Sequence, residues 1–425
     1  MVGAGIAGLS AAWLLSRAHD VTLFEANDYL GGHTHTVEVT LDGVTAPVDT
    51  GFLVFNDRTY PHLIALFDHL GVASCASDMS FSVRIAAENI EWAGSNLAAV
   101  FAQRRNLLRP QFWGMLSDIL RFNREATAIA QDSGGSALTL GEFLAAGIYG
   151  RAFRDWYLLP MAGAIWSCPT AMMLDYPART FFAFCANHGL LQVRDRPQWR
   201  TVIGGACTYV DRLATEIGNI RVNTPVAAVL RRPGGAMLRL AGGDTQIFDV
   251  VVLACHSDQA LRLLGDADAA EREVLGAIRY QDNSVILHTD ERFLPRSRAA
   301  WSAWNYHAHD AAAQAQPVGV SYLINQLQPL PFRQPVIVTL NPGDEPRPAS
   351  VIDRYTYAHP VFDQAGIAAQ ARLPQLQGQR NTWFCGAWAG YGFHEDGLKA
   401  GMAVAADLGV NAPWLASAAA RRVAA

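Results

Sequence analysis

The sequence predicts an α/β fold in which a Rossmann-like domain is combined with a second, α+β domain. Three observations lead to this prediction. The chain opens with a glycine-rich turn, a helix-forming stretch and a short apolar strand, which together cover residues 2–24. Two further apolar runs predict strands, residues 249–254 and 382–385, and the first is typical of a parallel strand buried on both faces. Residues 78–92 and 280–341 are rich in strand-forming side chains.

The predicted Rossmann-like domain is discontinuous. We expect it to be formed by residues 1–75, 196–265 and 350–425. The second, substrate-binding domain would comprise residues 76–195 and 266–349, with a mixed sheet and a helical insertion at about residues 96–189. A chain of 425 residues is long enough for two or three domains.

The opening turn has the spacing of a dinucleotide-binding loop. Gly3, Gly5 and Gly8 form G-x-G-x-x-G directly before the helix-forming stretch. Gly3 would make the tight turn, Gly5 would let a pyrophosphate approach the backbone, and Gly8 would let the helix pack closely. The first helical residues, Ile6 and Ala7, offer free backbone N–H groups to phosphates.

An acidic residue at the end of the next strand limits the choice of nucleotide. Glu25 follows the apolar run 21–24, at roughly the distance of 20 residues that the fingerprint requires. Its carboxylate can accept hydrogen bonds from a ribose diol and would repel a 2′-phosphate. The spacing therefore favours FAD or NAD over NADP.

The next residues favour FAD. Ala26 and four more residues separate the acid from Gly31, Gly32 and His33, which gives the string E-x-x-x-x-x-G-G-H. This string resembles the amine-oxidase-type FAD superfamily, which includes monoamine and polyamine oxidases, protoporphyrinogen oxidase and carotene desaturases. The resemblance implies that the second glycine pair passes close to the pyrophosphate of FAD. An arginine usually follows these glycines, and an imidazole in its place would hold phosphate less firmly.

The resemblance assigns further positions to the cofactor. In that superfamily a turn of small residues passes the isoalloxazine ring, and Thr50, Gly51 and Phe52 match it, with a plain loop as the alternative. In the same superfamily, a valine on a later strand contacts the adenine end of FAD through its backbone. Val226 is the matching position in this chain. Ala254, at the end of its apolar strand, is also expected to contact the cofactor.

The C-terminal segment completes the predicted cofactor site. It contains a strand, a turn at Gly386 and Ala387, and a helix that begins near Glu395, Asp396 and Gly397. A flavin needs a donor at N1 and O2, where negative charge collects on reduction, and a helix N-terminus supplies N–H groups and a dipole. The superfamily uses this segment in that way, but its usual aspartate is replaced here by Ala387. The contact to the ribityl chain is therefore expected from the backbone or elsewhere.

Only Met1 and Val2 precede the glycine turn, whereas a strand normally has ~5–6 residues. The first strand of a doubly wound sheet is central. We therefore expect the natural chain to begin upstream, and the cofactor domain of the shortened chain to be unstable.

Composition excludes several classes of function. The net charge of −5 argues against nucleic acid as a partner. The six cysteines show no C-x-x-C spacing and indicate a reducing compartment, and no metal site is expected. Because no apolar run reaches ~18 residues, no transmembrane helix is predicted. We expect a cytoplasmic protein.

One stretch leaves contact with a membrane surface open. Residues 104–113 interleave three arginines with leucine, phenylalanine and tryptophan, a composition that can lie on a lipid surface. The protein would then be peripheral at the inner membrane face. Ordinary packing with a solvated charged face is the alternative.

Further motifs narrow the resemblance. VDTGFLVFNDRTYP, SDMSFSV, WYLLPMAGAIWS, LACHSDQAL, NYH and GYGFHEDGL resemble a bacterial branch of predicted NAD/FAD-binding proteins. That branch is similar to the flavoprotein desaturase of furan-fatty-acid synthesis and to the N-terminal part of plant cyclopropane-fatty-acid synthases. The resemblance implies a desaturase or dehydrogenase that transfers a hydride from a methyl-branched fatty acyl chain to flavin N5.

The residues expected to act on the substrate lie in two segments. His394 is the candidate proton acceptor, with packing or an indirect role as the alternative, and Tyr391 and Phe393 would shape the cavity. Adjacent predicted strands carry aromatic and amide side chains that could line an apolar cavity: Trp301, Trp304, Asn305, Tyr306 and Tyr322.

Two other functions stay open at this stage. The first is a flavin amine oxidase, although such oxidases commonly hold a water at N5 with a lysine of the second domain. The only lysine here, Lys399, lies on the C-terminal cofactor helix. The second is a non-catalytic lipid or ligand carrier, because the expected fold also resembles GDP-dissociation inhibitors. The expected partner is a small-molecule or lipid substrate, and the electron acceptor is left open.

Overall fold

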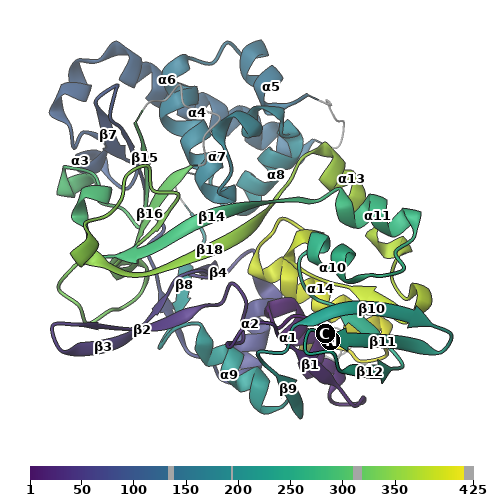
Figure 1. Cartoon of the computed structure of the whole chain (residues 1–425). Helices are drawn as coiled ribbons and strands as arrows, with labels where there is room; N and C mark the ends of the chain where they lie inside the picture. Colours follow the sequence, from purple (N-terminus) through teal and green to yellow (C-terminus); the bar gives the residue numbers. More distant parts are fainter. Residues whose placement is uncertain (133–137, 193–194, 310–317, 416–425) are drawn as a thin grey trace, which may run out of the picture.

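The computed structural model describes residues 1–132, 138–192, 195–309 and 318–415. Figure 1 shows two parts. One part holds α1 (Ile6–Leu15) and α14 (His394–Asp407) around a small parallel sheet. The other part holds a seven-stranded mixed sheet with helices packed on it. This arrangement confirms the predicted fold class.

The parallel sheet forms where the apolar runs predicted it. β1 (Thr22–Phe24) pairs with β9 (Asn219–Arg221), and β13 (Val251–Leu253) pairs with β19 (Thr382–Phe384). Val2 lies between the two pairs and bridges a residue of each in parallel, Phe24 and Leu253. All three residues of β13 are buried, as expected for a strand covered on both faces.

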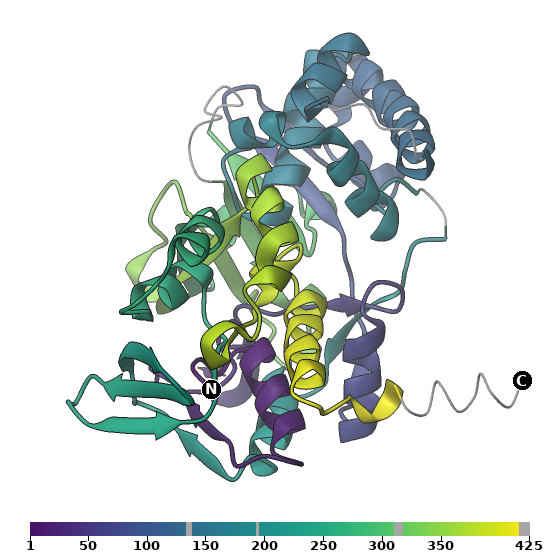
Figure 2. The same ribbon diagram turned by 90° about the vertical axis from the view of Figure 1, so that its right-hand side faces the viewer.

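Helices cover one face of this sheet. Ala7 of α1 and Val404 of α14 pack on Val252, which gives this face an apolar core. Figure 2 shows α14 between α1 and α2 (Pro61–Leu70). α2 ends at Gly71, which has a φ of 70°. α9 (Cys207–Thr215) packs beside α1 and α2.

Strands and two short helices cover the other face. Here Val2, Phe24 and Leu253 share a core with Val229 and Leu238 of an antiparallel sheet. The elements of this layer are β10 (Val226–Arg232), β11 (Gly235–Leu240), β12 (Thr245–Phe248), α10 (Ser257–Leu263) and α11 (Ala269–Gly276).

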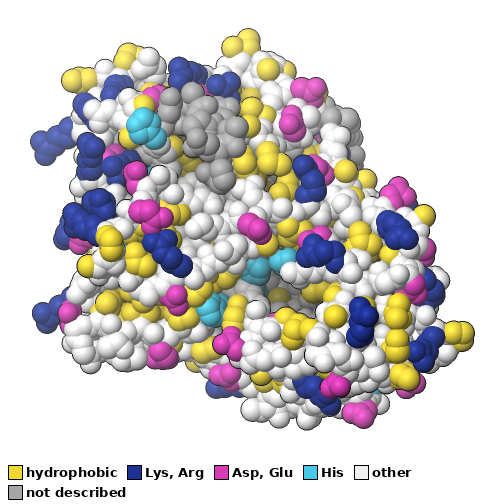
Figure 3. Space-filling model, in the orientation of Figure 1, with side chains coloured by type: hydrophobic (Ala, Val, Ile, Leu, Met, Phe, Trp, Pro, Cys, Tyr) yellow, Lys and Arg dark blue, Asp and Glu magenta, His cyan; other side chains and the backbone are white. Residues whose placement is uncertain are grey.

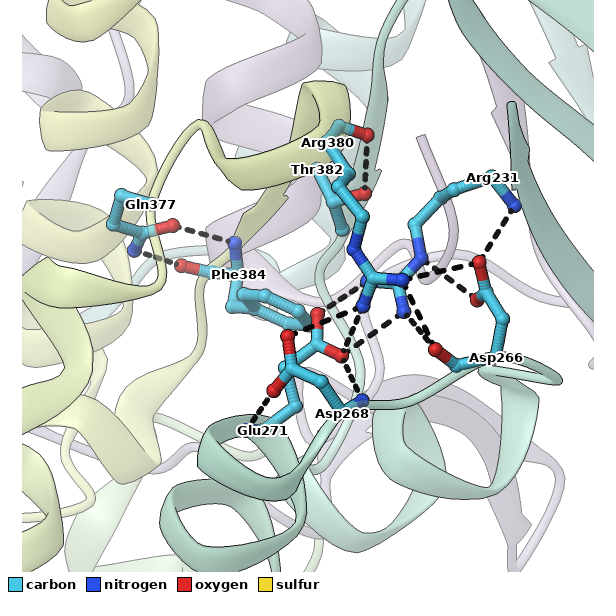
Figure 4. A network of polar contacts seen from close by, with 8 residues as sticks. All are labelled: Arg231, Asp266, Asp268, Glu271, Gln377, Arg380, Thr382 and Phe384. Atoms are coloured by element: carbon cyan, nitrogen blue, oxygen red, sulfur yellow. Dashed lines mark hydrogen bonds and ion pairs between the residues drawn. The ribbon is translucent and has the colours of Figure 1, made fainter. Parts of the chain in front are cut away.

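A network of charged side chains fastens β10 to α11 and to the turn before β19 (Figure 4). The side chain of Arg231 is only 1% exposed and lies between Asp266, at 2.8 Å, and Glu271. Arg380 reaches the same glutamate at 2.8 Å. Removal of one partner would leave a buried charge without compensation, which is costly.

Two small antiparallel sheets connect the parts. β2 (Thr36–Leu41) and β3 (Val44–Asp49) form a hairpin. A three-stranded sheet has the order β4 (Phe55–Asn56), β8 (Trp199–Val202) and β5 (Ser74–Ala76).

The seven-stranded sheet is mixed, because β15 and β6 pair in parallel whereas the other neighbours are antiparallel. Its order is β18 (Val351–Val361), β14 (Arg279–His288), β17 (Ile337–Leu340), β16 (Gly319–Leu323), β15 (Trp304–Ala308), β6 (Phe81–Ile85) and β7 (Ile90–Ala93). The division into two domains stays a prediction, but the boundary predicted at residue 350 shifts, because β18 belongs to the seven-stranded sheet. The chain leaves this sheet after residue 361 and not at residue 350.

The helical insertion packs on one face of this sheet. Phe112, Phe122 and Phe182 share a core with Tyr306 and Tyr322 of the sheet. The helices are α3 (Leu97–Val100), α4 (Pro110–Gln131), α5 (Leu140–Ala146), α6 (Arg151–Phe153), α7 (Leu159–Trp166) and α8 (Ala178–Asn187); α12 (Ile324–Leu327) and α13 (Gln364–Arg372) lie later in the chain. None of the helices in the described ranges is long and apolar enough to cross a membrane.

Candidate active site

The glycine turn lies against the end of β13. Gly3 has a φ of 100°, and a Cβ on it would lie 2.9 Å from the Ala254 carbonyl oxygen. A Cβ on Gly8 would lie 1.9 Å from the Gly3 oxygen, so α1 packs as closely as predicted. In contrast, a Cβ on Gly5 would meet no atom within 4 Å. The turn therefore borders open space at the N-terminus of α1, which no described side chain caps.

Glu25 is positioned by the glycine turn. Its carboxylate accepts hydrogen bonds from the N–H of Ala4 at 2.8 Å and of Asn27 at 2.9 Å. A carboxylate has about four acceptor positions, so two stay available for ribose hydroxyls. Thr224 donates its N–H to the Glu25 carbonyl oxygen at 2.8 Å, which brings Val226 to the same place. The exposed Ala26 lies beside this acid.

Three imidazoles and a phenol meet beside the second glycine pair. Gly31 forms a parallel bridge with Gly5, and His33 follows two residues later. The ring of His33 lies 5.3 Å from Tyr357, 5.4 Å from His359 and 6.0 Å from His256, measured between centroids. Figure 3 shows histidine side chains in the hollow at the middle of this face.

Burial lowers the pKa of each of these imidazoles, which favours the neutral form. Burial, together with the neighbouring imidazoles, holds the pKa of His33 well below its usual range, and burial lowers that of His359 to about 4. The buried Nε2 of His33 has no hydrogen-bond partner among the described residues. Within the described ranges, no group of three or more His, Cys, Asp and Glu side chains could hold a metal ion. A polar partner for His33, such as a phosphate oxygen, would satisfy the unpaired nitrogen.

The predicted flavin turn lies next to His33. Phe52 donates its N–H to the His33 carbonyl oxygen at 2.8 Å, and a Cβ on Gly51 would lie 2.1 Å from that oxygen. The hydroxyl of Thr50 lies 2.7 Å from that of Tyr357. The turn is thereby held between the second glycine pair and β18 of the seven-stranded sheet.

The C-terminal helix reaches the same region. A Cβ on Gly397 would lie 2.7 Å from Ile6 Cγ2, so the N-terminal turns of α14 and α1 are adjacent. Asp396 accepts the N–H of Phe393 at 3.1 Å, and Glu395 accepts the N–H of Leu63 at 2.9 Å. Since both carboxylates are bonded within the protein, a role in cofactor binding falls to the backbone N–H groups of this turn. Gly386 and Ala387 form the connection from β19.

The prediction that His394 has a pKa suited to accept a proton at neutral pH is wrong. Burial lowers its pKa to about 3. Its Nε2 lies 2.9 Å from the Thr34 hydroxyl and 2.8 Å from that of Tyr209, and its ring stacks on Phe52 with centroids 3.6 Å apart. These contacts favour the alternative, in which His394 positions the turn that carries Phe52.

An apolar cavity of about 230 Å³ borders this region. Phe362, in its wall, lies close to the turn before α14, because a Cβ on Gly392 would be 3.1 Å from the Phe362 ring. Trp166, also in its wall, lies 4.6 Å from Phe184, whose ring stacks on Phe393 at 5.3 Å. Tyr391 lies 5.9 Å from Phe184. The aromatic residues predicted on this turn thus border the cavity wall.

The predicted aromatic strands divide between two faces of the sheet. Trp304, Tyr306 and Tyr322 belong to the core that faces the helical insertion. Asn305 points to the opposite face, where its amide is bonded to Ser82, Ser302 and Ser321. Trp301 packs with Leu323 and Ile337 on that face as well. The wall of the cavity of about 230 Å³ contains none of the five residues predicted to line it.

Five further side chains at this site are not indicated by any sequence pattern: Thr34, Tyr209, His256, Tyr357 and His359. These side chains come from four separate segments, and no local spacing brings them together. Alternation along a strand could have placed Asn305 away from Trp304 and Tyr306.

The residues present fit a flavin dinucleotide. The site combines the uncapped N-terminus of α1, the open space at Gly5, the Glu25 carboxylate with spare acceptor positions, and the buried His33 imidazole, whose Nε2 has no partner among the described residues. The fold and this site define a dinucleotide-binding flavoprotein. Residues 6–324 match the family of flavin containing amine oxidoreductases, and the chain belongs to that family. It is therefore an FAD-dependent oxidoreductase, which removes the carrier alternative.

Solved structures share the fold. Putrescine oxidase bound to putrescine has a TM-score of 0.68 and 16% identity, over 96% of this chain and 97% of that one. A CLA-producing fatty acid isomerase from P. acnes has a TM-score of 0.68 and 16% identity, over 96% and 98%. Cyclohexylamine oxidase from Brevibacterium oxydans IH-35A has a TM-score of 0.65 and 18% identity, over 96% and 98%.

Proposed function

We propose that the protein desaturates a lipid-like substrate, a methyl-branched fatty acyl chain. The observation that carries this proposal is the apolar cavity beside the turn of α14, with Trp166, Met172, Met173, Tyr176 and Phe362 in its wall. Each methylene buried there contributes ~0.8 kcal/mol. The resemblance of several motifs to a flavoprotein desaturase supports the same substrate class, as does the fatty acid isomerase among the proteins of this fold.

When bound, FAD supplies a hydride acceptor at its N5 atom. The chain's own residues bind and orient the substrate. The indole N–H of Trp166 has no hydrogen-bond partner among the described residues, so it is free to donate to a carbonyl or carboxylate oxygen of the acyl group. Tyr391 and Phe393 exclude water from the approach to α14. A methyl-branched carbon is the favoured site of hydride loss, because three alkyl groups stabilise the resulting cation. The neighbouring carbon would then lose a proton to solvent, and the electron pair of that C–H bond would form the double bond.

We propose that the cofactor is held by the residues predicted from the sequence. The N–H groups of Ile6 and Ala7 would meet the pyrophosphate, Glu25 the ribose and Val226 the adenine end. The backbone of Gly51 and of the turn at Gly397 would border the flavin ring. His33, with His256 and His359, adds imidazoles at the pyrophosphate that the family's usual arginine does not provide.

An amine substrate is the second candidate. The exposed carboxylate of Asp175 lies in the cavity wall and could pair with an ammonium group. Asp363, the other acid there, is already paired with Arg279 at 2.8 Å. The only lysine, Lys399, is exposed on α14. One free acid at the edge of an apolar cavity supports an amine less well than an acyl chain.

Substitution of a cavity residue tests the proposal. Met172→Trp fills part of the cavity, whereas Met172→Leu keeps its volume and polarity. Saturated fatty acids from octanoate to octadecanoate are titrated into each FAD-loaded protein, and binding is followed by the flavin absorbance. We expect affinity to rise about fourfold per added methylene until the cavity is full, and Met172→Trp to shorten the chain length at which this rise stops. An affinity independent of chain length, or equal in all three proteins, would contradict the acyl-chain proposal.

A further inference from the structure

Large apolar side chains are exposed together on the first part of the helical insertion. Leu108 is 86% exposed, Leu97 77%, Leu120 62%, Trp113 49% and Leu107 46%. We refer to these five residues as the α3–α4 face. Isolated exposed leucines are common, but a group of this size on one surface marks an interaction site.

The contacts show that these residues form one surface. The indole of Trp113 donates to the carbonyl oxygen of Leu107 at 3.0 Å. Phe101, one turn after Leu97, lies 5.4 Å from the Trp113 ring. Leu120 is two turns after Trp113 on the same side of α4. The core side of α4 is formed by other residues, Phe112, Met115, Phe122 and Ala126, so the α3–α4 face is not needed for packing within the protein.

The α3–α4 face is surrounded by basic side chains, although the protein as a whole is acidic. Residues 97–124 contain five arginines and one acid, Asp118, whereas the whole chain has a net charge of −5. Asp118 is paired with Arg121. Arg104, Arg105 and Arg124 are exposed and form no ion pair within the described ranges. Figure 3 shows basic side chains along the edge of the molecule at the position of α3 and β7.

We propose that the α3–α4 face docks on an anionic lipid bilayer. Arginines attract anionic headgroups, leucines enter the boundary with the acyl chains, and tryptophan prefers that boundary. A second copy of the chain is a poor partner, because a two-fold contact would bring the same arginines together. The docking surface is separate from the cavity and does not depend on which substrate the enzyme oxidises.

Vesicle co-sedimentation of the FAD-loaded protein tests this inference. Vesicles of phosphatidylglycerol and phosphatidylethanolamine are compared with vesicles of phosphatidylcholine. We expect binding to the anionic vesicles that weakens with salt. Arg104→Gln with Arg105→Gln should weaken it about 30-fold, since each arginine near the surface contributes about fivefold. Leu108→Ser with Trp113→Ser should weaken it at least about tenfold.

The matched control is Ile247→Ser, because Ile247 is 66% exposed on β12, outside the α3–α4 face. This variant should bind vesicles as the unchanged protein does, and FAD absorbance together with circular dichroism confirms the folding of each variant. Failure of the unchanged protein to bind anionic vesicles would overturn the proposal, as would equal binding by all variants. The proposal would also be overturned if the protein did not bind vesicles but sedimented as a dimer that Leu108→Ser dissociates. The α3–α4 face would then be a self-association surface.

Discussion

A methyl group added at Gly401 should force α14 away from α1. A Cβ at this position would lie 2.5 Å from the Ala7 carbonyl oxygen and 2.5 Å from the Ser10 hydroxyl. Carbon and oxygen normally approach no closer than about 3.3 Å, so the helices must separate by about 0.8 Å. Overpacking of this kind costs about 1–3 kcal/mol. Alanine gains about 1 kcal/mol over glycine in a helix, which offsets part of this cost.

The variant Gly114→Ala measures by itself the stability that alanine gains over glycine in a helix. Gly114 is exposed inside α4, and a Cβ on it would meet no atom within 4 Å. We expect Gly114→Ala to raise the free energy of unfolding and Gly401→Ala to be about 1–3 kcal/mol less stable than Gly114→Ala in urea titrations. Because both helices begin at the cofactor site, the dissociation constant for FAD should rise at least about fivefold in Gly401→Ala alone. If Gly401→Ala were as stable as Gly114→Ala and bound FAD normally, the close packing of α1 and α14 would not be what forms the site.

Three other predictions concern charged side chains. Burial raises the pKa of Asp49 to about 6, so the folded protein holds this proton more tightly than the unfolded chain does. The free energy of unfolding should therefore fall by on the order of 3 kcal/mol as the pH rises from about 4 to about 6, and a pH series in urea should show no such fall for Asp49→Asn. Glu271→Gln should lower the free energy of unfolding by about 3 kcal/mol in the same assay, because it leaves the charge of the buried Arg231 only partly compensated. The control Arg262→Gln breaks an exposed ion pair and should lower it by less than about 1 kcal/mol. Equal losses in the two variants would refute the burial argument. Glu25→Lys should weaken FAD binding by about 2–4 kcal/mol in calorimetry, and an unchanged affinity would exclude a bond to the ribose.

The fold and the cofactor residues could be predicted because their signals are local. Gly3, Gly5 and Gly8 have a fixed spacing before a helix. β13 has an apolar run that is typical of a strand buried on both faces. The hairpin β2–β3 was indicated by its alternation and by Asp42 and the glycine after it. Each of these depends on neighbours in the chain.

The rest depended on contacts between distant segments. His359 meets His33 only because β18 pairs with β14 and passes the glycine turn, whereas His256 comes from the turn between β13 and α10. The pKa of His394 follows from burial, which no spacing reports. β18 itself was assigned to the cofactor part, because its alternating sequence does not say which sheet it joins. The unusual exposure of Leu108 likewise became visible only once the core side of α4 was known.

Anaerobic reduction of the bound FAD tests the substrate most directly. The oxidised protein is mixed, without oxygen, with methyl-branched acyl lipids, with straight-chain acyl lipids, and with common mono- and polyamines, and the flavin absorbance is followed. We expect the methyl-branched lipids to bleach the flavin and the amines to leave it oxidised. Bleaching by an amine at micromolar concentration, with none by any lipid, would contradict the proposed function.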